Sequence, residues 1–316
     1  MKTLITGAAG FIGSHLCEAL VKDHQIIGLD NFCDFYDPKI KENNISFLQG
    51  SPNFKLVKTD IRNQLELAEV FKANKFDLVI HLAAMAGVRP SIENPQLYTE
   101  VNINGTVNLL EECRKHNVKN FIFASSSSVY GNNKKVPFAE SDPVDHPISP
   151  YASTKKAGEL ICHTYHHLHQ MSMACLRFFT VYGPRQRPDL AIRKFSRMML
   201  NGEEIPVFGD GSTKRDYTYI DDIIDGILKA IDFVLSGNKY DVFNLGESQT
   251  ISLTKMIQTI ENTLEIKAKK KILPMQPGDV EQTYADISKS KTILGYNPET
   301  DFETGIAKFI DWLKIQ

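Results

Sequence analysis

A glycine-rich turn near the N-terminus constrains the fold of this chain more than any other feature. The apolar run Lys2-Thr3-Leu4-Ile5-Thr6 predicts a buried strand, which is followed by Gly7-Ala8-Ala9-Gly10-Phe11-Ile12-Gly13 and then by a helical pattern from Ser14 to Leu20. Glycines let the backbone turn tightly and approach a pyrophosphate, whose charge is stabilised by the free N–H groups and positive dipole end of the helix. The segment therefore predicts the strand, turn and helix of a dinucleotide-binding fold.

A second predicted strand identifies the dinucleotide. The glycine spacing is GxxGxxG, which departs from the commoner GxGxxG, so the turn alone is a weak signal. The strand Gln25-Ile26-Ile27-Gly28-Leu29-Asp30 ends in a carboxylate about 20 residues after the first glycine, where a ribose diol is bound in such folds. Asp30 would repel a 2′-phosphate, and residues 31 to 38 contain no Arg or Lys to neutralise one. The sequence therefore favours NAD over NADP.

Tyr151 and Lys155 form the clearest candidate for acid–base chemistry. They stand four residues apart at the start of a predicted helix, so they share one face. Lowering the pKa of a phenol from about 10 to ~7 requires about 4 kcal/mol of preference for the phenolate. A cation at ~4 Å supplies roughly 4 kcal/mol at an effective dielectric near 20. A Tyr and a Lys at this spacing are more often surface residues that only stabilise the end of a helix. The glycine turn and Asp30, which predict a bound dinucleotide, favour the catalytic interpretation here.

Composition and charge exclude several classes of protein. The chain has 316 residues, of which 42% are hydrophobic and 23% charged, and its net charge is -2, so nucleic acid and anionic membranes are not expected partners. Five scattered cysteines without CxxC spacing predict neither a disulfide framework nor a zinc site, and they fit a reducing compartment. No apolar run approaches a membrane span and no signal peptide is recognisable. We therefore expect a cytoplasmic protein.

Apolar strands alternate with amphipathic stretches along the first 180 residues, which predicts an α/β fold with a doubly wound, Rossmann-like parallel sheet. The further strands are expected at 55–61, 77–84, 120–125 and 173–179, and the helices at 64–73, 95–116 and 151–170. After this the pattern loosens, and residues 221 to 245 predict a helix and a strand that returns to the sheet. We expect an NAD-binding domain of residues 1–179 plus about 221–246, and a smaller substrate domain of about 180–220 plus 247–316.

The motifs together resemble the extended short-chain dehydrogenase/reductase family over nearly the whole chain. Those that carry the resemblance are GxxGxxG, Asp30, Asp60-Ile61, His81-Leu82-Ala83-Ala84, Ser125 to Gly131, Tyr151 to Lys155, Arg177-Phe178-Phe179-Thr180-Val181-Tyr182-Gly183-Pro184, Gly209-Asp210-Gly211 and Arg215-Asp216-Tyr217. Within the family the chain looks most like the nucleotide-sugar 4-epimerases. It is particularly similar to the UDP-glucuronate 4-epimerases, through residues 84–89, 125–131 and 184–189.

The resemblance implies a role for each catalytic candidate. Tyr151 would be the general base on the sugar 4′-hydroxyl, Lys155 would lower its pKa and hold the nicotinamide ribose, and Ser126 would hydrogen-bond the same hydroxyl. Hydride would pass from C4′ to NAD, and the 4-keto sugar would turn over and take it back on its other face, so the net reaction is an isomerisation.

The resemblance also implies the contacts with NAD. The pyrophosphate is expected at Gly7, Gly10 and Gly13, with Phe11 and Ile12 beside it. The adenosine ribose is expected at Asp30 and Asn31, and the adenine at Asp60 and Ile61. The middle of the NAD molecule is expected at Leu82, Ala83 and Ala84, with Asn102 as a further cofactor residue.

Ser127, Ser128 and Thr180 discriminate between related activities. The family's dehydratases place Asp-Glu after the catalytic Ser/Thr, its UDP-glucuronate decarboxylases carry Glu in the place of Ser128, and its UDP-glucose epimerases usually have Asn in the place of Thr180. Small hydroxyls hold a C5 carboxylate by hydrogen bonds without repelling it. We therefore expect a uronate, bound by Ser127, Ser128, Thr180 and Arg187, with Arg89 as a weaker candidate. The alternative for these residues is ordinary loop polarity or, for the arginines, a diphosphate contact.

The UDP end of the substrate is assigned by the same resemblance. Arg215 would bind the diphosphate, Val207 and Phe208 would line the uracil, and Asp279 would meet the uridine ribose. Family members often carry an Arg shortly before that Gly-Asp, whereas Gln276 and Pro277 stand here, so a second diphosphate cation is not identified.

The remaining predictions concern a metal site, the oligomeric state and alternative functions. His163, His166, His167 and His169 crowd one helix without a carboxylate or Cys companion, so no metal site is expected. That helix and the one near 95–116 resemble the pair through which the family forms a homodimer. The alternative functions are a UDP-glucose or UDP-N-acetylglucosamine 4-epimerase, a UDP-glucuronate decarboxylase or nucleotide-sugar dehydratase, and a non-catalytic NAD-binding protein.

Overall fold

The structure is a computed structural model that describes residues 1–274 and 280–316. The chain divides into two compact units. The first unit comprises Met1–Asn132, Pro143–Arg177 and Ile224–Phe243, and the second comprises Asn133–Asp142, Phe178–Ile223 and Asn244–Gln316.

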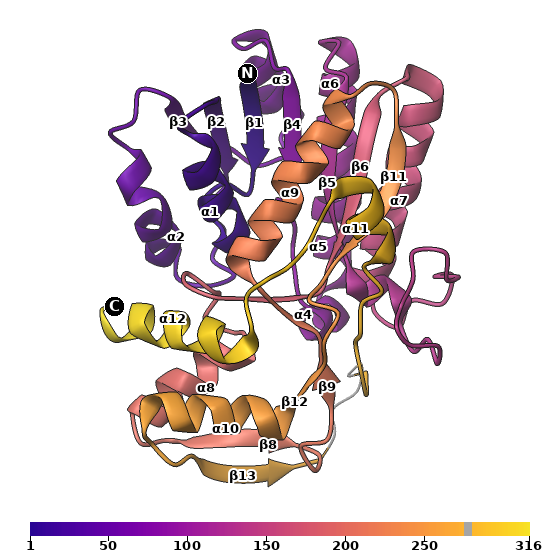
Figure 1. Ribbon diagram of the computed structural model, residues 1–316. Coiled ribbons are helices and arrows are strands. Elements are labelled where there is room, and N and C mark those ends of the chain that lie inside the picture. The colour runs from indigo at the N-terminus through magenta and orange to yellow at the C-terminus, as the bar shows by residue number, and fades with distance from the viewer. Residues whose placement is uncertain (275–279) are drawn as a thin grey trace. The chain divides into compact units, whose positions relative to one another are not determined.

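A seven-stranded, mostly parallel sheet forms the centre of the first unit, in the order β11-β6-β5-β4-β1-β2-β3 (Figure 1). Its strands are β1 (Lys2–Thr6), β2 (Gln25–Asp30), β3 (Phe54–Lys58), β4 (Leu78–His81), β5 (Asn120–Ser126), β6 (Ser172–Phe178) and β11 (Tyr240–Leu245). β1 pairs in parallel with both β2 and β4, which sets Thr3 opposite Ile26 and Leu78. The strand order reverses at β1, and ligands of doubly wound sheets bind at the carboxyl ends of the strands at such a point. The predicted fold class is confirmed, including the return of the chain to the sheet at β11.

Helices connect the strands of this unit (Figure 1). They are α1 (Phe11–Leu20), α2 (Pro38–Ile45), η1 (Ser46–Leu48), α3 (Gln64–Lys72), α4 (Val88–Glu93), α5 (Pro95–Thr99), η2 (Glu100–Asn104), α6 (Gly105–Lys115), η3 (Ser127–Tyr130), α7 (Pro150–His169) and α9 (Ile220–Leu235). α3 packs against α6, and α6 packs against α7.

The region predicted as one helix over 95–116 is interrupted. Its middle segment η2 is a π-helical turn, which separates α5 from α6. A π-helical turn contains one extra residue, and hydrophobic periodicity does not encode it.

Apolar side chains from strands and helices fill the core of the first unit. Leu4, Val79 and Phe121 on the sheet and Leu109 and Leu110 on α6 belong to one buried cluster. Burial of each such side chain stabilises the fold by roughly 1.5–3 kcal/mol. The predicted strands read as continuous apolar runs because both faces of this sheet are covered.

Among its described residues, the second unit contains three short two-stranded sheets. β7 (Thr180–Tyr182) pairs in parallel with β10 (Tyr217–Tyr219), β9 (Lys214–Arg215) pairs antiparallel with β12 (Ile251–Ser252), and β8 (Glu204–Phe208) pairs in parallel with β13 (Lys269–Leu273). Its helices are α8 (Ala191–Leu200), α10 (Leu253–Leu264), α11 (Ser288–Leu294) and α12 (Phe302–Lys314). α10 packs against both α8 and α12. Throughout residues 1–274 and 280–316, no helix combines the length and the apolar character needed to cross a bilayer.

Candidate active site

The glycine turn between β1 and α1 is closed by backbone contacts that leave no room for a side chain at Gly7 or Gly13. Gly7 has a φ of +72°, and a Cβ at this position would lie 2.8 Å from the Ala83 nitrogen. A Cβ at Gly13 would lie 2.1 Å from the Gly7 carbonyl oxygen. Gly10 is the N-cap of α1 and provides no side-chain hydrogen bond to the first turn, where Phe11 and Ile12 lie. No N-cap side chain therefore occupies the first N–H groups of the helix. An anion-binding turn needs such N–H groups to be available to the ligand.

Asp30 ends β2 beside this turn. Its side chain is 6% exposed, and its carboxylate accepts hydrogen bonds from the Ala9 N–H at 3.1 Å and the Phe32 N–H at 2.9 Å. Burial raises the pKa of Asp30 above the ordinary Asp value, although both hydrogen bonds and the charge of Lys41 oppose this effect. The carboxylate is therefore held in one orientation by the backbone.

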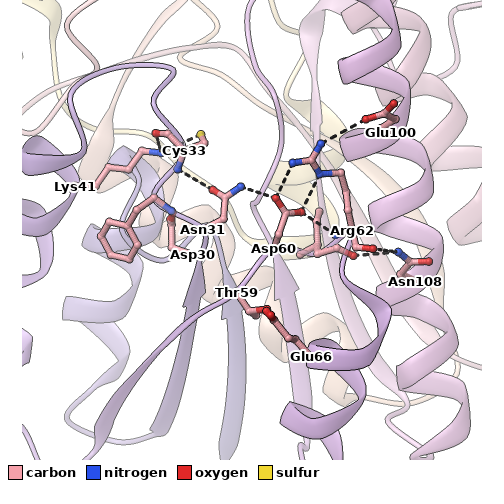
Figure 2. A network of polar contacts seen from close by, with 12 residues as sticks. Asp30, Asn31, Cys33, Lys41, Thr59, Asp60, Arg62, Glu66, Glu100 and Asn108 are labelled. Atoms are coloured by element: carbon pink, nitrogen blue, oxygen red, sulfur yellow. Dashed lines mark hydrogen bonds and ion pairs between the residues drawn. The ribbon is translucent and has the colours of Figure 1, made fainter.

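A polar network extends from Asn31, the residue after Asp30, to Asn108 of α6, as Figure 2 shows. The Asn31 amide donates to Asp60 Oδ2 at 2.8 Å, and the Arg62 guanidinium binds the same carboxylate at 2.9 Å and reaches Glu100 at 3.4 Å. Burial opposes ionisation of Asp60, but the bonds from Arg62 and Asn31 prevail and lower its pKa to about 2. Arg62 was not predicted, although its pairing with Asp60 is local in sequence; only its contact with Glu100, 38 positions away, requires the folded chain.

The segment after β4 lies against the glycine turn. The Thr6 hydroxyl accepts a hydrogen bond from the Ala83 N–H at 3.2 Å, between Leu82 and Ala84. Asn102 is 2% exposed, and its side chain binds both the N–H and the carbonyl of Met85 and also Thr154. In this structure Asn102 therefore joins the loop after β4 to helix α7, and its contact with a cofactor stays a prediction.

These features fit a bound dinucleotide. Pyrophosphate and ribose are recognised by a turn with tightly packed glycines, a helix N-terminus without a side-chain cap and an oriented carboxylate at the end of β2. Ile61, next to Asp60, is 3% exposed and packs close to Gly105 of α6.

Tyr151 and Lys155 lie at the start of α7, as their spacing predicts. Ser149 caps the helix by accepting from the Ala152 N–H, and Pro150 occupies the first turn, which pre-organises φ for a helix. The Lys155 ammonium lies 5.9 Å from the centroid of the Tyr151 ring and donates a 2.7 Å hydrogen bond to the Ala124 carbonyl of β5. Burial lowers the pKa of Lys155 to about 8.

The serine segment follows β5, close to the Lys155 contact with Ala124. Ser126 is the N-cap of η3, and its hydroxyl accepts from the Ser128 N–H at 3.2 Å and the Ser128 hydroxyl at 3.0 Å. Ser126 and Ser127 are partly exposed, as a residue that contacts a ligand must be. Arg89 is exposed on α4 of the same unit.

In the second unit Thr180 begins β7, which pairs with β10, and Arg215 ends β9, just before β10 in the chain. The Thr180 N–H donates to the Asp216 carbonyl at 3.0 Å, directly after Arg215. The Asp216 carboxylate is fully buried and accepts from the N–H groups of Glu247, Ser248 and Ala285, while burial raises its pKa to about 6. Asp216 therefore fixes the backbone that carries both predicted substrate residues.

The remaining substrate candidates of this unit lie in different elements. Arg187 forms two hydrogen bonds with Asp189, at 3.0 and 2.7 Å, so its charge is balanced locally. Val207 and Phe208 end β8, and Val207 is 4% exposed. Asp279 lies outside the described residues.

Within the described residues, no group of three or more His, Cys, Asp and Glu side chains is arranged to hold a metal ion. Of the histidines on α7, His163 and His166 instead make ring contacts with Tyr240, at 5.0 and 5.7 Å between centroids.

Comparison with known proteins identifies the family. The profile described as GDP-mannose 4,6 dehydratase matches residues 4–309. UDP-glucuronate 4-epimerase 4 of Arabidopsis thaliana is 46% identical over 98% of this chain and 74% of its own length. The crystal structure of UDP-glucuronic acid 4-epimerase from Bacillus cereus, in complex with UDP-glucuronic acid and NAD, has a TM-score of 0.92 at 39% identity and covers 100% of this chain and 99% of that chain.

A UDP-glucose 4-epimerase from Thermotoga maritima, solved with UDP-glucose, has a TM-score of 0.91 at 31% identity over 100% of this chain and 99% of that chain. From the family profile and these likenesses, the chain belongs to the GDP-mannose 4,6-dehydratase-like extended short-chain dehydrogenases/reductases and is close to the UDP-glucuronate 4-epimerases.

Proposed function

We propose that this protein is an NAD-dependent UDP-sugar 4-epimerase that interconverts UDP-glucuronate and UDP-galacturonate. The observation that carries the proposal is the placement of the Lys155 ammonium beside the Tyr151 ring, in the unit whose glycine turn and Asp30 fit NAD. The names and bound ligands of its relatives support the same substrate.

Tyr151 acts as the general base and later as the general acid. Its phenolate takes the proton of the sugar 4′-hydroxyl, and Lys155 stabilises that phenolate by its positive charge. The glycine turn and Asp30 would hold NAD, which would supply the reversible hydride chemistry needed at C4′. Tyr151 then gives the proton back to the 4′-oxygen, so no atom is gained or lost and only the configuration at C4′ changes.

Ser126 orients the reacting hydroxyl. It already accepts two hydrogen bonds from Ser128, so its own hydroxyl hydrogen is directed elsewhere and is available to the 4′-oxygen. This bond favours the alkoxide that develops as the proton leaves, which is the charge a catalytic donor must stabilise.

We assign the C5 carboxylate of the sugar to the hydroxyls of Ser127, Ser128 and Thr180 and to Arg187, with Arg89 as a further candidate. Positions 127 and 128 carry no acidic side chain, and a carboxylate there would repel the substrate. Because Asp189 binds Arg187, that arginine contributes fully only if the substrate displaces Asp189. The single hydroxyl hydrogen of Ser128 is donated to Ser126, so Ser128 can bind the carboxylate through its hydroxyl only when that bond is exchanged.

The UDP moiety is assigned to the second unit. Arg215 is the proposed diphosphate cation, and its backbone is fixed next to the buried Asp216. Val207 and Phe208 are proposed for the uracil and Asp279 for the uridine ribose.

A UDP-glucose 4-epimerase is the second candidate, because a UDP-glucose 4-epimerase of known structure has nearly the same TM-score as the uronate enzyme. A decarboxylase would release CO2 from the keto sugar and a dehydratase would leave a double bond. Ser127 and Ser128 stand in the places of the dehydratases' Asp-Glu pair, and Ser128 stands in the place of the decarboxylases' Glu, so both activities are disfavoured.

We further propose that the protein acts as a cytoplasmic homodimer. Leu160 and Leu168 of α7 are 57% and 64% exposed in the single chain, and a second copy packed on this helix would bury them. Sedimentation of the purified protein tests the oligomeric state.

Incubation with a panel of UDP-sugars, followed by proton NMR of the products, tests the reaction. UDP-galacturonate should form from UDP-glucuronate faster than UDP-galactose forms from UDP-glucose. Tyr151→Phe should remove this activity while the protein still binds NAD, and full activity of that variant would exclude the mechanism.

A further inference from the structure

A fully buried ion pair lies beneath the proposed catalytic residues of the first unit. The Arg177 guanidinium donates two hydrogen bonds of 2.8 Å to the Glu159 carboxylate, one to each oxygen, and both side chains are 2% exposed. Glu159 comes from α7 and Arg177 from β6. Neither residue was predicted from the sequence to act in the site.

The pair holds both ends of the segment that carries the three serines. At the first end, the Ser125 hydroxyl donates a 2.6 Å hydrogen bond to Glu159. At the other end, Arg177 donates a 2.9 Å bond to the Tyr130 hydroxyl, and its guanidinium lies 4.8 Å from the Tyr130 ring centroid. Ser126, Ser127 and Ser128 lie between these two attachment points.

The same carboxylate belongs to the helix that carries the proposed base. Glu159 follows Lys155 by four residues and Tyr151 by eight, so all three lie along one face of α7. The position of Ser126 relative to Tyr151 therefore depends on contacts that start from this one helix face.

Stability alone does not account for such a pair. Replacing a buried ion pair by apolar residues of similar volume is often neutral or stabilising, because desolvation offsets the attraction of the charges. Burial opposes ionisation of Glu159, but the bonds and charge of Arg177 and the bond from Ser125 prevail, so its pKa is below the ordinary Glu value. Both members of the pair therefore stay charged. Glu159 accepts a hydrogen bond from one end of the serine segment, and Arg177 donates one to the other end.

We propose that Glu159 and Arg177 are positioning residues, which clamp Ser125 and Tyr130 so that the Ser126 hydroxyl keeps its place relative to Tyr151. This inference rests on the proposed epimerase function for the identity of the reacting groups. Misplacement of a reacting group by as little as ~1 Å costs up to roughly 100-fold in rate. Loosening the segment should therefore lower kcat more than it changes KM.

The test uses one small variant at each end of the segment. Removal of Glu159 leaves Arg177 as an uncompensated buried charge, and removal of Arg177 leaves the buried Glu159 with only Lys156, at 3.5 Å, so those variants are expected to fold poorly. Ser125→Ala and Tyr130→Phe each delete a single hydroxyl and leave the ion pair intact. Matched controls are Ser172→Ala and Tyr296→Phe, whose hydroxyls are also buried and hydrogen-bonded but lie outside the segment.

Three properties of each NAD-loaded variant are measured: kinetics with UDP-glucuronate, NAD content, and hydrogen exchange of the backbone amides. In Ser125→Ala and Tyr130→Phe we expect kcat to fall about 10-fold with KM and NAD content unchanged. The amides of Ser128 and Gly131, which are hydrogen-bonded within the segment, should exchange faster in these variants than in the wild type. The two controls should match the wild type in every measurement.

The inference is overturned if kcat and amide exchange are unchanged in both variants, or if kcat falls only in proportion to lost NAD. It is also overturned if the controls lose the same activity. Failure of the proposed function would look different, because the wild type would then convert no UDP-sugar. Amide exchange would still decide whether the pair holds the segment.

Discussion

The Lys155 ammonium donates a 2.7 Å hydrogen bond to the carbonyl oxygen of Ala124, which joins the first turns of α7 to the end of β5. The charge is buried there and also lies 5.2 Å from the centroid of the Phe123 ring. A buried ammonium is costly to hold, and this cost has a measurable consequence.

Lys155→Met should abolish epimerisation and yet stabilise the dinucleotide-free protein at pH 7. Burial lowers the pKa of Lys155 from 10.5 to about 8, which corresponds to a penalty of about 3 kcal/mol. Loss of the bond to Ala124 costs about 1 kcal/mol, so the free energy of unfolding should rise by roughly 2 kcal/mol.

The pH dependence fixes the sign of this effect. Because the folded pKa is depressed, the wild type carries the penalty below pH 8 and is free of it above pH 10.5, so the advantage of the variant should shrink between these values. Urea unfolding at several pH values in this range measures the stability difference between the variant and the wild type. Lys39→Met, at an exposed position of α2, is the control. A variant less stable than the wild type at pH 7 would contradict the prediction.

Alanine substitutions in the glycine turn should weaken NAD binding in a fixed order. A Cβ added at Gly13 would lie 2.1 Å from the Gly7 carbonyl oxygen, and one added at Gly10 would lie 3.1 Å from the same oxygen. A Cβ added at Gly50 would meet no atom within 4 Å. We expect Gly13→Ala to lose NAD and about 2 kcal/mol of stability, Gly10→Ala to lose less, and Gly50→Ala to match the wild type. Calorimetry with NAD and thermal unfolding measure both effects, and equal affinities would count against the turn as the cofactor site.

Ser128→Glu should discriminate against uronates. A second carboxylate at ~4 Å from that of the sugar costs roughly 4 kcal/mol at an effective dielectric near 20. We therefore expect kcat/KM for UDP-glucuronate to fall at least ~100-fold, and that for UDP-glucose to fall much less. Ser128→Gln has the same size without the charge and serves as the control. If the two variants lose the same activity on both sugars, Ser128 does not face the carboxylate.

The sequence predicted the scaffold better than the contacts that orient the site. β1 and β2 begin and end at the predicted residues because an apolar run, a glycine turn and a terminal carboxylate all act locally. The π-helical turn η2 was missed, since its extra residue leaves no mark on the hydrophobic period.

Partners far apart in the chain were also missed. Arg177 contacts Glu159 across 18 positions and Tyr130 across 47, and only the assembled sheet and helix bring the three together. The helical spacing of Glu159 from Lys155 was the one local signal that could have indicated its role.

The second unit contains a glutamate whose charge should control its stability at neutral to alkaline pH. Burial, reinforced by Asp222, Asp216 and Asp301, raises the pKa of Glu247 from 4.5 to about 8. One of its carboxylate oxygens is buried, with no hydrogen-bond partner among the described residues. Because the folded pKa is raised, the contribution of Glu247 to stability is fully present below pH 4.5 and is lost as pH rises through 8.

Glu247→Gln removes the ionisable group and keeps the shape of the side chain. The variant should equal the wild type in stability near pH 4.5, gain an advantage as pH rises to about 8, and keep that advantage at higher pH. Thermal unfolding across this range measures the difference, and Glu265→Gln on the exposed end of α10 is the control. A difference that stays constant from pH 4.5 to 9, or that favours the wild type as pH rises, would show that Glu247 is already ionised in the folded protein at neutral pH.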